Sequence, residues 1–166
     1  MFREITPDEA APLLRYHYCP QMPANPRHCY GIEAGGAIIA AAVWCPISAG
    51  GRVYIEFAAM AKDPRWHKLQ ISSLISYSCN QLRRYRYGLA VTFVEADRSE
   101  GKVFSAASWE YAGIRRRHPA GIRLLGDIID RPEDGAVHIY WKALNRFGKH
   151  HAKRLNLAHT GQELVG

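Results

Sequence analysis

The chain has 166 residues, of which 48% are hydrophobic and 22% are charged, and its formal net charge is +7. This is the size and composition of one globular domain with a sizeable core, and no apolar run approaches the roughly 20 residues that a membrane-spanning helix needs. Because the sequence begins with mixed polar residues and not with a signal peptide, we expect a soluble cytoplasmic protein, and the excess of positive charge favours a polyanionic partner.

The first predicted element is a helix that begins after Thr6. The Thr6 hydroxyl can cap it, Pro7 suits its first position, and acidic residues follow where the helix dipole favours them. Leu13 and Leu14 give this helix an apolar face. Three prolines between residues 19 and 28 then predict an irregular loop.

Two strands are predicted next, over residues 38–43 and 53–60. A long amphipathic helix is expected over residues 67–87, because apolar residues recur there at three- and four-residue intervals. Residues 89–94 are almost all apolar, which is typical of a central strand covered on both faces.

A short helix around residues 103–109 and a last strand over residues 137–141 complete the predicted elements. The sequence contains no internal repeat and no sign of a second domain. We therefore predict an α/β (α+β) single domain over residues 1–145, built on a mixed twisted sheet with helices on both faces. Residues 146–166 are basic and lack regular periodicity, so we expect a tail that either frays or forms a helix on its target.

The end of the first helix is one candidate site. His17 offers a proton acceptor near neutral pH, and its neighbour Tyr18 offers a hydroxyl and a flat ring. His17 and Cys19 also belong to the residue types that bind transition metals, although no two cysteines have the spacing of a metal-binding pair. The alternative is a helix end packed by aromatic rings, with His17 merely hydrogen-bonded.

Asp97 is a second candidate, because it follows the buried strand directly. In open α/β sheets ligands bind outside the carboxyl ends of the strands, where a carboxylate can orient or deprotonate an attacking amine. The alternative is that Asp97 caps the helix that follows it.

Two further segments have the composition of binding sites. Residues 104–113 place small side chains between aromatic ones and include Phe104, Ser108 and Tyr111; a thin ligand can approach such a segment closely, but a packed helix has the same composition. The start of the long helix combines basic side chains with the hydroxyls of Ser72 and Ser73, which favours phosphate binding, although no glycine-rich loop precedes it.

Basic residues are grouped and not evenly spread. They suit contacts to nucleic-acid phosphates and equally suit an ordinary solvated surface. The grouped residues are Arg83, Arg84, Arg86, Arg115, Arg116, Arg117, Lys149, Lys153 and Arg154.

The order of these motifs over about residues 14–113 resembles the Mom proteins of Mu-like phages. The resemblance is carried by His17-Tyr18, by Ser72-Ser73-Leu74-Ile75 leading into Arg83-Arg84, by the strand that ends at Asp97, and by the segment from Phe104 to Gly113. Mom proteins are similar to the GNAT acyltransferases, and they modify adenine N6 in duplex DNA, which protects phage DNA from restriction in the bacterial host.

The resemblance implies a GNAT-like fold, catalytic roles for His17, Tyr18 and Asp97, and a lesser role for Tyr111. It also implies double-stranded DNA as partner, acyl-CoA such as acetyl-CoA as donor, and iron as a cofactor for which His17 and Cys19 are candidate ligands.

The sequence departs from the family at three places. Phe104 stands where the family commonly has tyrosine. The arginine that the family has before the long helix is absent, and Lys62 or Arg65 can substitute for it. The GNAT pyrophosphate signature is missing.

These observations predict a phage DNA-modification enzyme that transfers an acyl-type group to adenine N6. In this hypothesis Asp97 holds the amine, His17 transfers the proton and Tyr18 stacks on or orients the extruded base. One alternative is a GNAT-type acetyltransferase that acts on a small-molecule or protein amine. The other is a nucleic-acid-binding protein without catalytic activity.

Overall fold

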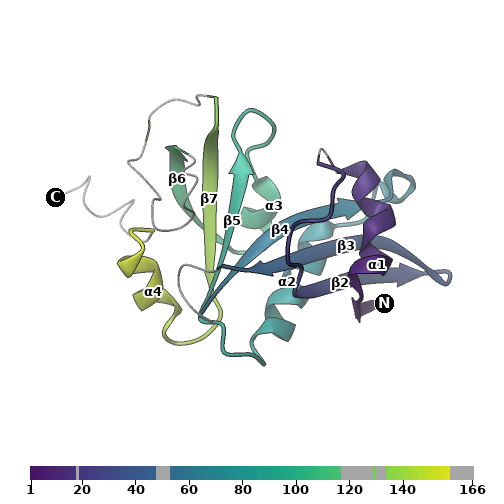
Figure 1. The fold of residues 1–166 in the computed structure, drawn as a ribbon, viewed down its shortest axis with the longest axis horizontal. Helices are drawn as coiled ribbons and strands as arrows, with labels where there is room; N and C mark the ends of the chain where they lie inside the picture. Colours follow the sequence, from purple (N-terminus) through teal and green to yellow (C-terminus); the bar gives the residue numbers. More distant parts are fainter. Residues whose placement is uncertain (18, 48–52, 117–128, 130–133, 158–166) are drawn as a thin grey trace.

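A computed structural model describes residues 1–17, 19–47, 53–116, 129 and 134–157, and within these residues the chain forms one seven-stranded sheet (Figure 1). The strand order is β1-β2-β3-β4-β5-β7-β6. The strands are β1 (Phe2–Ile5), β2 (His28–Ala34), β3 (Ala37–Pro46), β4 (Tyr54–Lys62), β5 (Leu89–Glu95), β6 (Glu110–Arg116) and β7 (Ala136–Ala143).

The described residues also form six helical segments, five of them between strands and one, α4, after the last strand. The α-helices are α1 (Pro7–Ala10), α2 (Ile71–Leu82), α3 (Lys102–Ala106) and α4 (Gly148–Arg154), and the 3₁₀ segments are η1 (Ala11–Tyr16) and η3 (Pro64–Trp66). No helix in this part of the chain is both long and apolar enough to cross a membrane.

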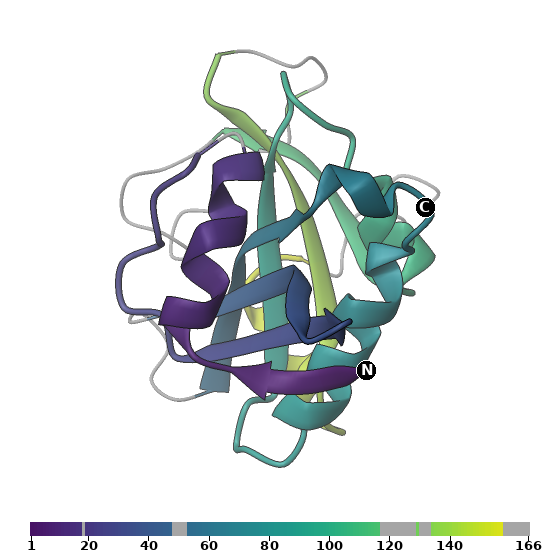
Figure 2. The ribbon, with the colours of Figure 1, turned by 90° about the vertical axis from the view of Figure 1, so that its right-hand side faces the viewer.

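Helices cover both faces of the sheet, as predicted (Figures 1 and 2). On one face, Leu74 and Ile75 of α2 and Phe104 of α3 pack in a core cluster with the side chains of β2, β3 and β4. On the other face, Leu13 and Leu14 of η1 pack on β3 and β4. The same face carries α4, and Ala152 of this helix packs with Leu155 and Leu157, which follow it, against β5 and β7.

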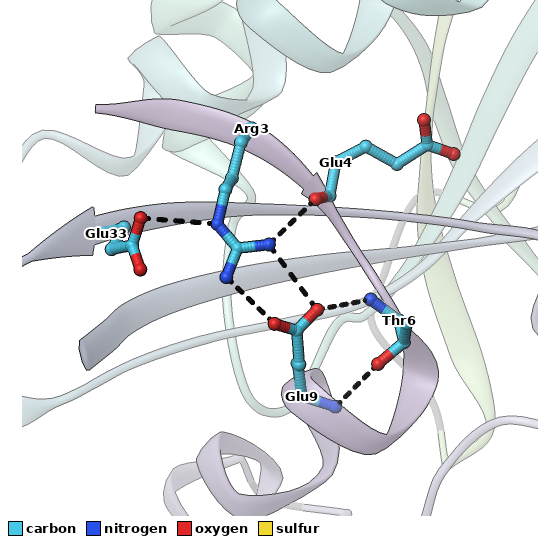
Figure 3. Close-up of polar contacts among 5 residues, drawn as sticks. All are labelled: Arg3, Glu4, Thr6, Glu9 and Glu33. Carbon is cyan, nitrogen blue, oxygen red and sulfur yellow. Dashed lines mark hydrogen bonds and ion pairs between the residues drawn. The ribbon is translucent and has the colours of Figure 1, made fainter. Parts of the chain in front are cut away.

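The first helix begins where the sequence predicts it. The Thr6 hydroxyl accepts a hydrogen bond from the Glu9 backbone N–H at 3.2 Å, and the Glu9 carboxylate accepts one from the Thr6 backbone N–H at 2.8 Å, which is a capping box. Arg3 of β1 pairs with Glu9 at 2.8 Å and with Glu33 of β2 at 3.3 Å (Figure 3). These partly exposed pairs fix the first helix to the edge of the sheet.

Several boundaries and elements differ from the sequence prediction. Strands β1, β2 and β6 were not predicted, because β1 is short and charged, β2 contains Gly31 without apolar alternation, and β6 contains Gly113. Helix α2 is shorter at both ends than the predicted helix over 67–87. Residues 148–154 of the basic C-terminal segment form α4 against the chain's own sheet, whereas a tail that frays or forms a helix on its target was expected.

Candidate functional site at the divergence of β4 and β5

The sheet opens between its two central strands. All neighbouring strands pair antiparallel except β4 and β5, which run parallel and share only three residue pairs, from Tyr54↔Leu89 to Glu56↔Val91. Beyond this point β4 turns away from β5, as Figure 1 shows. We call the opening beyond the last pair the β4–β5 split. Backbone groups of both strands that would otherwise pair with each other line it.

A bulge and one side-chain hydrogen bond mark the apex of the split. The register between β3 and β4 shifts so that Ala58 is an extra residue on β4, and such a bulge bends its strand. The Thr92 hydroxyl of β5, which is buried, donates to the Phe57 carbonyl of β4 at 3.0 Å. A side chain therefore replaces the ladder bond at the position where the strands part.

Aromatic side chains close the split on the side of α2 and α3. The Phe57 ring contacts the rings of Trp44, Phe104 and Trp109 with centroid separations of 4.8, 5.4 and 6.4 Å. Ser108 has φ of +64°, which ends α3 and lets the Trp109 backbone N–H reach the Phe104 carbonyl at 2.9 Å. Phe104 therefore belongs to the aromatic wall of the split, to which it contributes no hydroxyl, and the exposed Ser108 forms the turn that leads to Trp109.

Lys62 at the end of β4 and Arg65 in the segment before α2 are the two residues predicted to replace the family's arginine in cofactor binding. The Lys62 ammonium donates to the carbonyls of His67 and Leu69 at 3.3 and 3.1 Å, and these hydrogen bonds hold the loop before α2 in place. Arg65 forms a 2.6 Å ion pair with Asp63, and its side chain is otherwise largely exposed. The Arg65 guanidinium holds the pKa of the Asp63 carboxyl below its usual range.

Ser72 and Ser73 lie in the first turn of α2, as predicted. No side chain caps this helix, and its first turn contains no acidic residue. The N-terminal N–H groups and the helix dipole are therefore available to an anion that reaches the end of β4.

His17 ends η1 and turns its ring back onto the chain. Its Nδ1 atom lies 3.1 Å from the Cys19 backbone nitrogen, which donates to it, and 3.0 Å from the Cys19 carbonyl. The Cys19 thiol is exposed, and Tyr18 lies outside the described residues. Figures 1 and 2 place the end of η1 and the turn after β5 at the same end of the molecule.

Asp97 lies in an exposed turn directly after β5. The residue at the N-terminus of α3 is Gly101, with φ of +69° and no side-chain cap. The alternative in which Asp97 caps the following helix is therefore wrong, and its carboxylate stays at the carboxyl end of the central strand.

The structure does not support the iron site that the resemblance implied. Within the described residues no group of three or more histidine, cysteine, aspartate or glutamate side chains is placed to hold a metal ion. The Nδ1 atom of His17 is already bonded to backbone atoms of Cys19.

Sequence reasoning missed Glu56, a half-buried carboxylate in the last residue pair before the split. It lies opposite Cys45 of β3, whose pKa is raised to about 12 by burial and, to a smaller extent, by the Glu56 charge. Strand alternation places Glu56 on the face of η1 and α4, opposite to the Phe57 ring. A glutamate inside a strand is not by itself a site candidate. Glu56 becomes one only because the structure shows that β4 and β5 diverge directly after it.

A second missed feature is a hydrogen bond of 2.7 Å between the Tyr111 hydroxyl and Nδ1 of His138. The two residues lie on neighbouring strands, β6 and β7, and line a hollow of about 420 Å³. Burial lowers the pKa of His138 and raises that of Tyr111, so both side chains are neutral near pH 7.

Not all of the predicted phosphate-binding residues are at the surface. Arg115 is only 1% exposed, and its guanidinium donates to the carbonyls of Ala112 and Asn156 at 3.2 and 2.6 Å. Its predicted role in gripping DNA is therefore wrong, because the bulge in β6 turns this side chain toward the end of α4. Arg116 is exposed, and Arg117 lies outside the described residues.

The other basic residues lie on two segments that adjoin each other. Gly88, which follows the end of α2, accepts a 2.9 Å hydrogen bond from the Leu144 N–H, and the Gly148 backbone packs closely against its carbonyl. We call the exposed cations on these adjoining segments the basic surface. They are Arg83, Arg84, Arg86, Arg146, Lys149, Lys153 and Arg154.

Comparison with known proteins identifies the fold. No family model and no curated protein matches the sequence. The ribosomal-protein-S18-alanine N-acetyltransferase from Escherichia coli matches in structure with a TM-score of 0.61 over 87% of this chain and 94% of its own, at 13% identity. A structure from Desulfovibrio desulfuricans assigned to the GNAT family gives 0.63 over 87% and 99%, at 10% identity.

The aminoglycoside 6'-N-acetyltransferase from Enterococcus faecium gives a TM-score of 0.60 over 87% of this chain and 97% of its own, at 9% identity. The chain therefore has the single-domain GNAT fold that the sequence predicted. At these identities the similarity concerns the fold, and these matches do not bear on the Mom proteins in particular.

Proposed function

We propose that this protein is an acyltransferase that moves an acyl group from acyl-CoA to an amine, with the donor bound in the β4–β5 split. The observation that carries the proposal is the split itself, where the parallel ladder stops after Glu56↔Val91 and a bulge follows on β4. An extended ligand with amide groups can bind the freed backbone groups of both strands.

The surroundings of the split support a donor that carries phosphates. The uncapped first turn of α2 lies just beyond β4 and contains no acidic side chain, and Arg65 is largely exposed nearby. These features favour a pyrophosphate at this helix end. Two of the structurally similar proteins are named as N-acetyltransferases.

The transfer needs a group that takes a proton from the amine. The amine nitrogen attacks the thioester carbonyl carbon, the C–S bond breaks, and CoA leaves as a thiolate that takes a proton from water. We assign the base to Glu56, because it adjoins the apex of the split on the face opposite to the aromatic wall. Phe104 has no hydroxyl, so it cannot supply the thiolate with a proton.

Calorimetric titration of the full chain with acetyl-CoA tests donor binding, and release of the CoA thiol with a panel of amines tests transfer. We expect acetyl-CoA to bind and thiol release to depend on an added amine. Lys149→Gln is a control, since Lys149 is exposed on α4, away from the split and from the start of α2. If the folded protein fails to bind acetyl-CoA at about 1 mM, the proposal is wrong.

The basic surface supports a second candidate, in which the accepting amine is adenine N6 in double-stranded DNA. Its cations form no ion pair with a carboxylate in the part of the chain that the structure describes. Uncompensated exposed cations favour binding to phosphates. In this hypothesis Asp97 holds the amine and His17 and Tyr18 assist, as the sequence predicted.

Mass spectrometry of nucleosides from bacteria that express the protein distinguishes the acceptors. A heavier deoxyadenosine that is lost in the His17→Ala and Asp97→Ala variants supports transfer to DNA. Unmodified DNA together with amine-dependent thiol release leaves a small-molecule or protein amine as acceptor. DNA binding without either activity indicates a nucleic-acid-binding protein.

A further inference from the structure

A hollow at the β6 edge of the sheet lies apart from the β4–β5 split. It has a volume of about 420 Å³, and its lining includes Tyr111 and Ile114 of β6, His138 and Tyr140 of β7, and Lys102 at the start of α3. The Phe104 ring of the aromatic wall stacks on the Tyr140 ring at 5.6 Å, so the Tyr140 ring separates the hollow from this wall.

The backbone is shaped to bring these side chains together. Between Tyr111 and Gly113 the register with β7 shifts by one residue, and Gly113 has φ of +97°. Residues three positions apart on a regular strand point to opposite faces, but this bulge places both Tyr111 and Ile114 on the hollow. Bulges that redirect side chains are frequent beside functional sites.

The loop before α3 is equally close-fitting. The Tyr140 hydroxyl donates to the Glu100 carbonyl at 2.6 Å. Gly101 follows with φ of +69°, and a Cβ atom there would lie 2.6 Å from Tyr140 Cε2. The backbone at Glu100 and Gly101, beside the hollow, is therefore held in contact with the Tyr140 ring that lines it.

His138 and Lys102 supply hydrogen-bond donors to the hollow. When the Tyr111 hydroxyl donates to Nδ1 of His138, the neutral imidazole carries its proton on Nε2. In the described part of the chain no hydrogen bond engages Nε2 of His138. Lys102 adds an ammonium, whose ion pair with Glu100 is 3.3 Å long between side chains that are 87% and 73% exposed. Such an exposed pair contributes little and is easily exchanged for another partner.

We propose that this hollow is a second ligand site and that it takes a small planar carboxylate. The ring of the ligand would lie on Tyr111 and Ile114, and its carboxylate would accept from Nε2 of His138 and from the Lys102 ammonium. The Glu100 carboxylate also lines the hollow, so binding requires Lys102 to turn from Glu100 to the ligand. The site is independent of acyl transfer.

Nitrogen-15 NMR of the histidine side chains in the full chain tests the site with benzoate as probe. We expect the Nε2–H tautomer of His138 in the free protein and saturable shifts of its signals with benzoate in the millimolar range. Benzamide, which has the same shape without the charge, should bind about 10-fold more weakly, and benzylamine should cause no shift. The His138→Gln variant assigns the signals.

Two variants examine the donors separately. Lys102→Gln should weaken benzoate binding about threefold, as expected for an exposed ion pair, and Tyr111→Phe should release the fixed tautomer and weaken binding several-fold. The matched controls are Lys68→Gln and Tyr85→Phe, which change an exposed lysine and an exposed tyrosine elsewhere, and these should bind benzoate like the parent protein. Absence of saturable shifts, or equal shifts with benzylamine, would overturn the proposal.

Discussion

The two ends of the central strand β5 carry charge in different ways. Where β5 ends, charged side chains are paired: Glu95 with Arg98 at 3.0 Å, and Glu100 with Lys102 at 3.3 Å. Where β5 begins, the basic surface presents seven cations, and the residues of its two segments, 83–88 and 144–157, include no carboxylate. The strand has seven residues, so the two ends are separated by roughly 20 Å.

This difference shows that the distribution of net charge does not indicate where the candidate acyl-transfer site lies. The excess of positive charge collects at the start of β5, whereas Asp97 and the opening of the split lie toward its carboxyl end. Binding of a polyanion and acyl transfer would therefore use separate parts of the surface. Substitutions that affect one function and spare the other test whether the separation is real.

The largest effect is expected at the split. Glu56→Gln removes the carboxylate with little change in volume, and loss of a general base typically costs about 100-fold or more in kcat. The KM for acetyl-CoA should change little, because Glu56 lies on the face opposite to the aromatic wall. Steady-state rates of thiol release measure both constants, and an unchanged kcat would remove Glu56 from the mechanism.

Thr92→Val should produce the next largest effect. The buried Phe57 carbonyl would lose its 3.0 Å hydrogen bond, and an unsatisfied buried group costs about 1–3 kcal/mol of unfolding free energy. The apex of the split would also lose its cross-strand bond, so the KM for acetyl-CoA should rise several-fold while kcat changes less.

Thr92→Ser is the matched control for that substitution, because it keeps the hydroxyl and removes only the methyl group. Urea unfolding and donor titration of both variants separate the two consequences. If valine and serine behave alike in both measurements, the hydroxyl does not position the split.

How far the sequence could predict this fold depended on local signals. Helix α1 was predicted correctly because Thr6 and Pro7 specify a helix start, and β5 was predicted because a strand buried on both faces is almost entirely apolar. Strand β6 was missed because its bulge and Gly113 interrupt the alternation. A strand that depends on its partner for its register has no clear pattern of its own.

The site was less predictable than the fold. The position of Asp97 at the end of a strand could be predicted from chain order alone, and its role stays a prediction. Glu56 was missed because its position depends on where β4 leaves β5, which no local pattern records. Arg115 was misassigned because its sequence neighbours are basic, whereas a bulge in the backbone decides that its side chain is buried.

At the other end of β5, charge removal should weaken binding to double-stranded DNA. Replacing Arg83 and Arg84 together by Gln should lower duplex affinity about 10-fold at low salt and reduce the salt dependence by about two counterions. Kinetics of thiol release should be unaffected. Fluorescence anisotropy with duplexes of different sequence is the measurement, and an unchanged affinity would show that the basic surface is only a solvated surface.

Arg116→Gln should give the smallest change and is therefore the sharpest control. Arg116 is exposed like Arg84, but it ends β6 opposite Ala136, whose carbonyl accepts from the Ala96 N–H at 3.0 Å, so it lies at the carboxyl end of β5. A model in which any surface arginine contributes to DNA binding predicts equal losses for Arg84→Gln and Arg116→Gln. The separation of the two ends predicts a loss below about twofold for Arg116→Gln. Equal losses would mean that DNA contacts both ends of β5, as transfer to a base held at Asp97 would require.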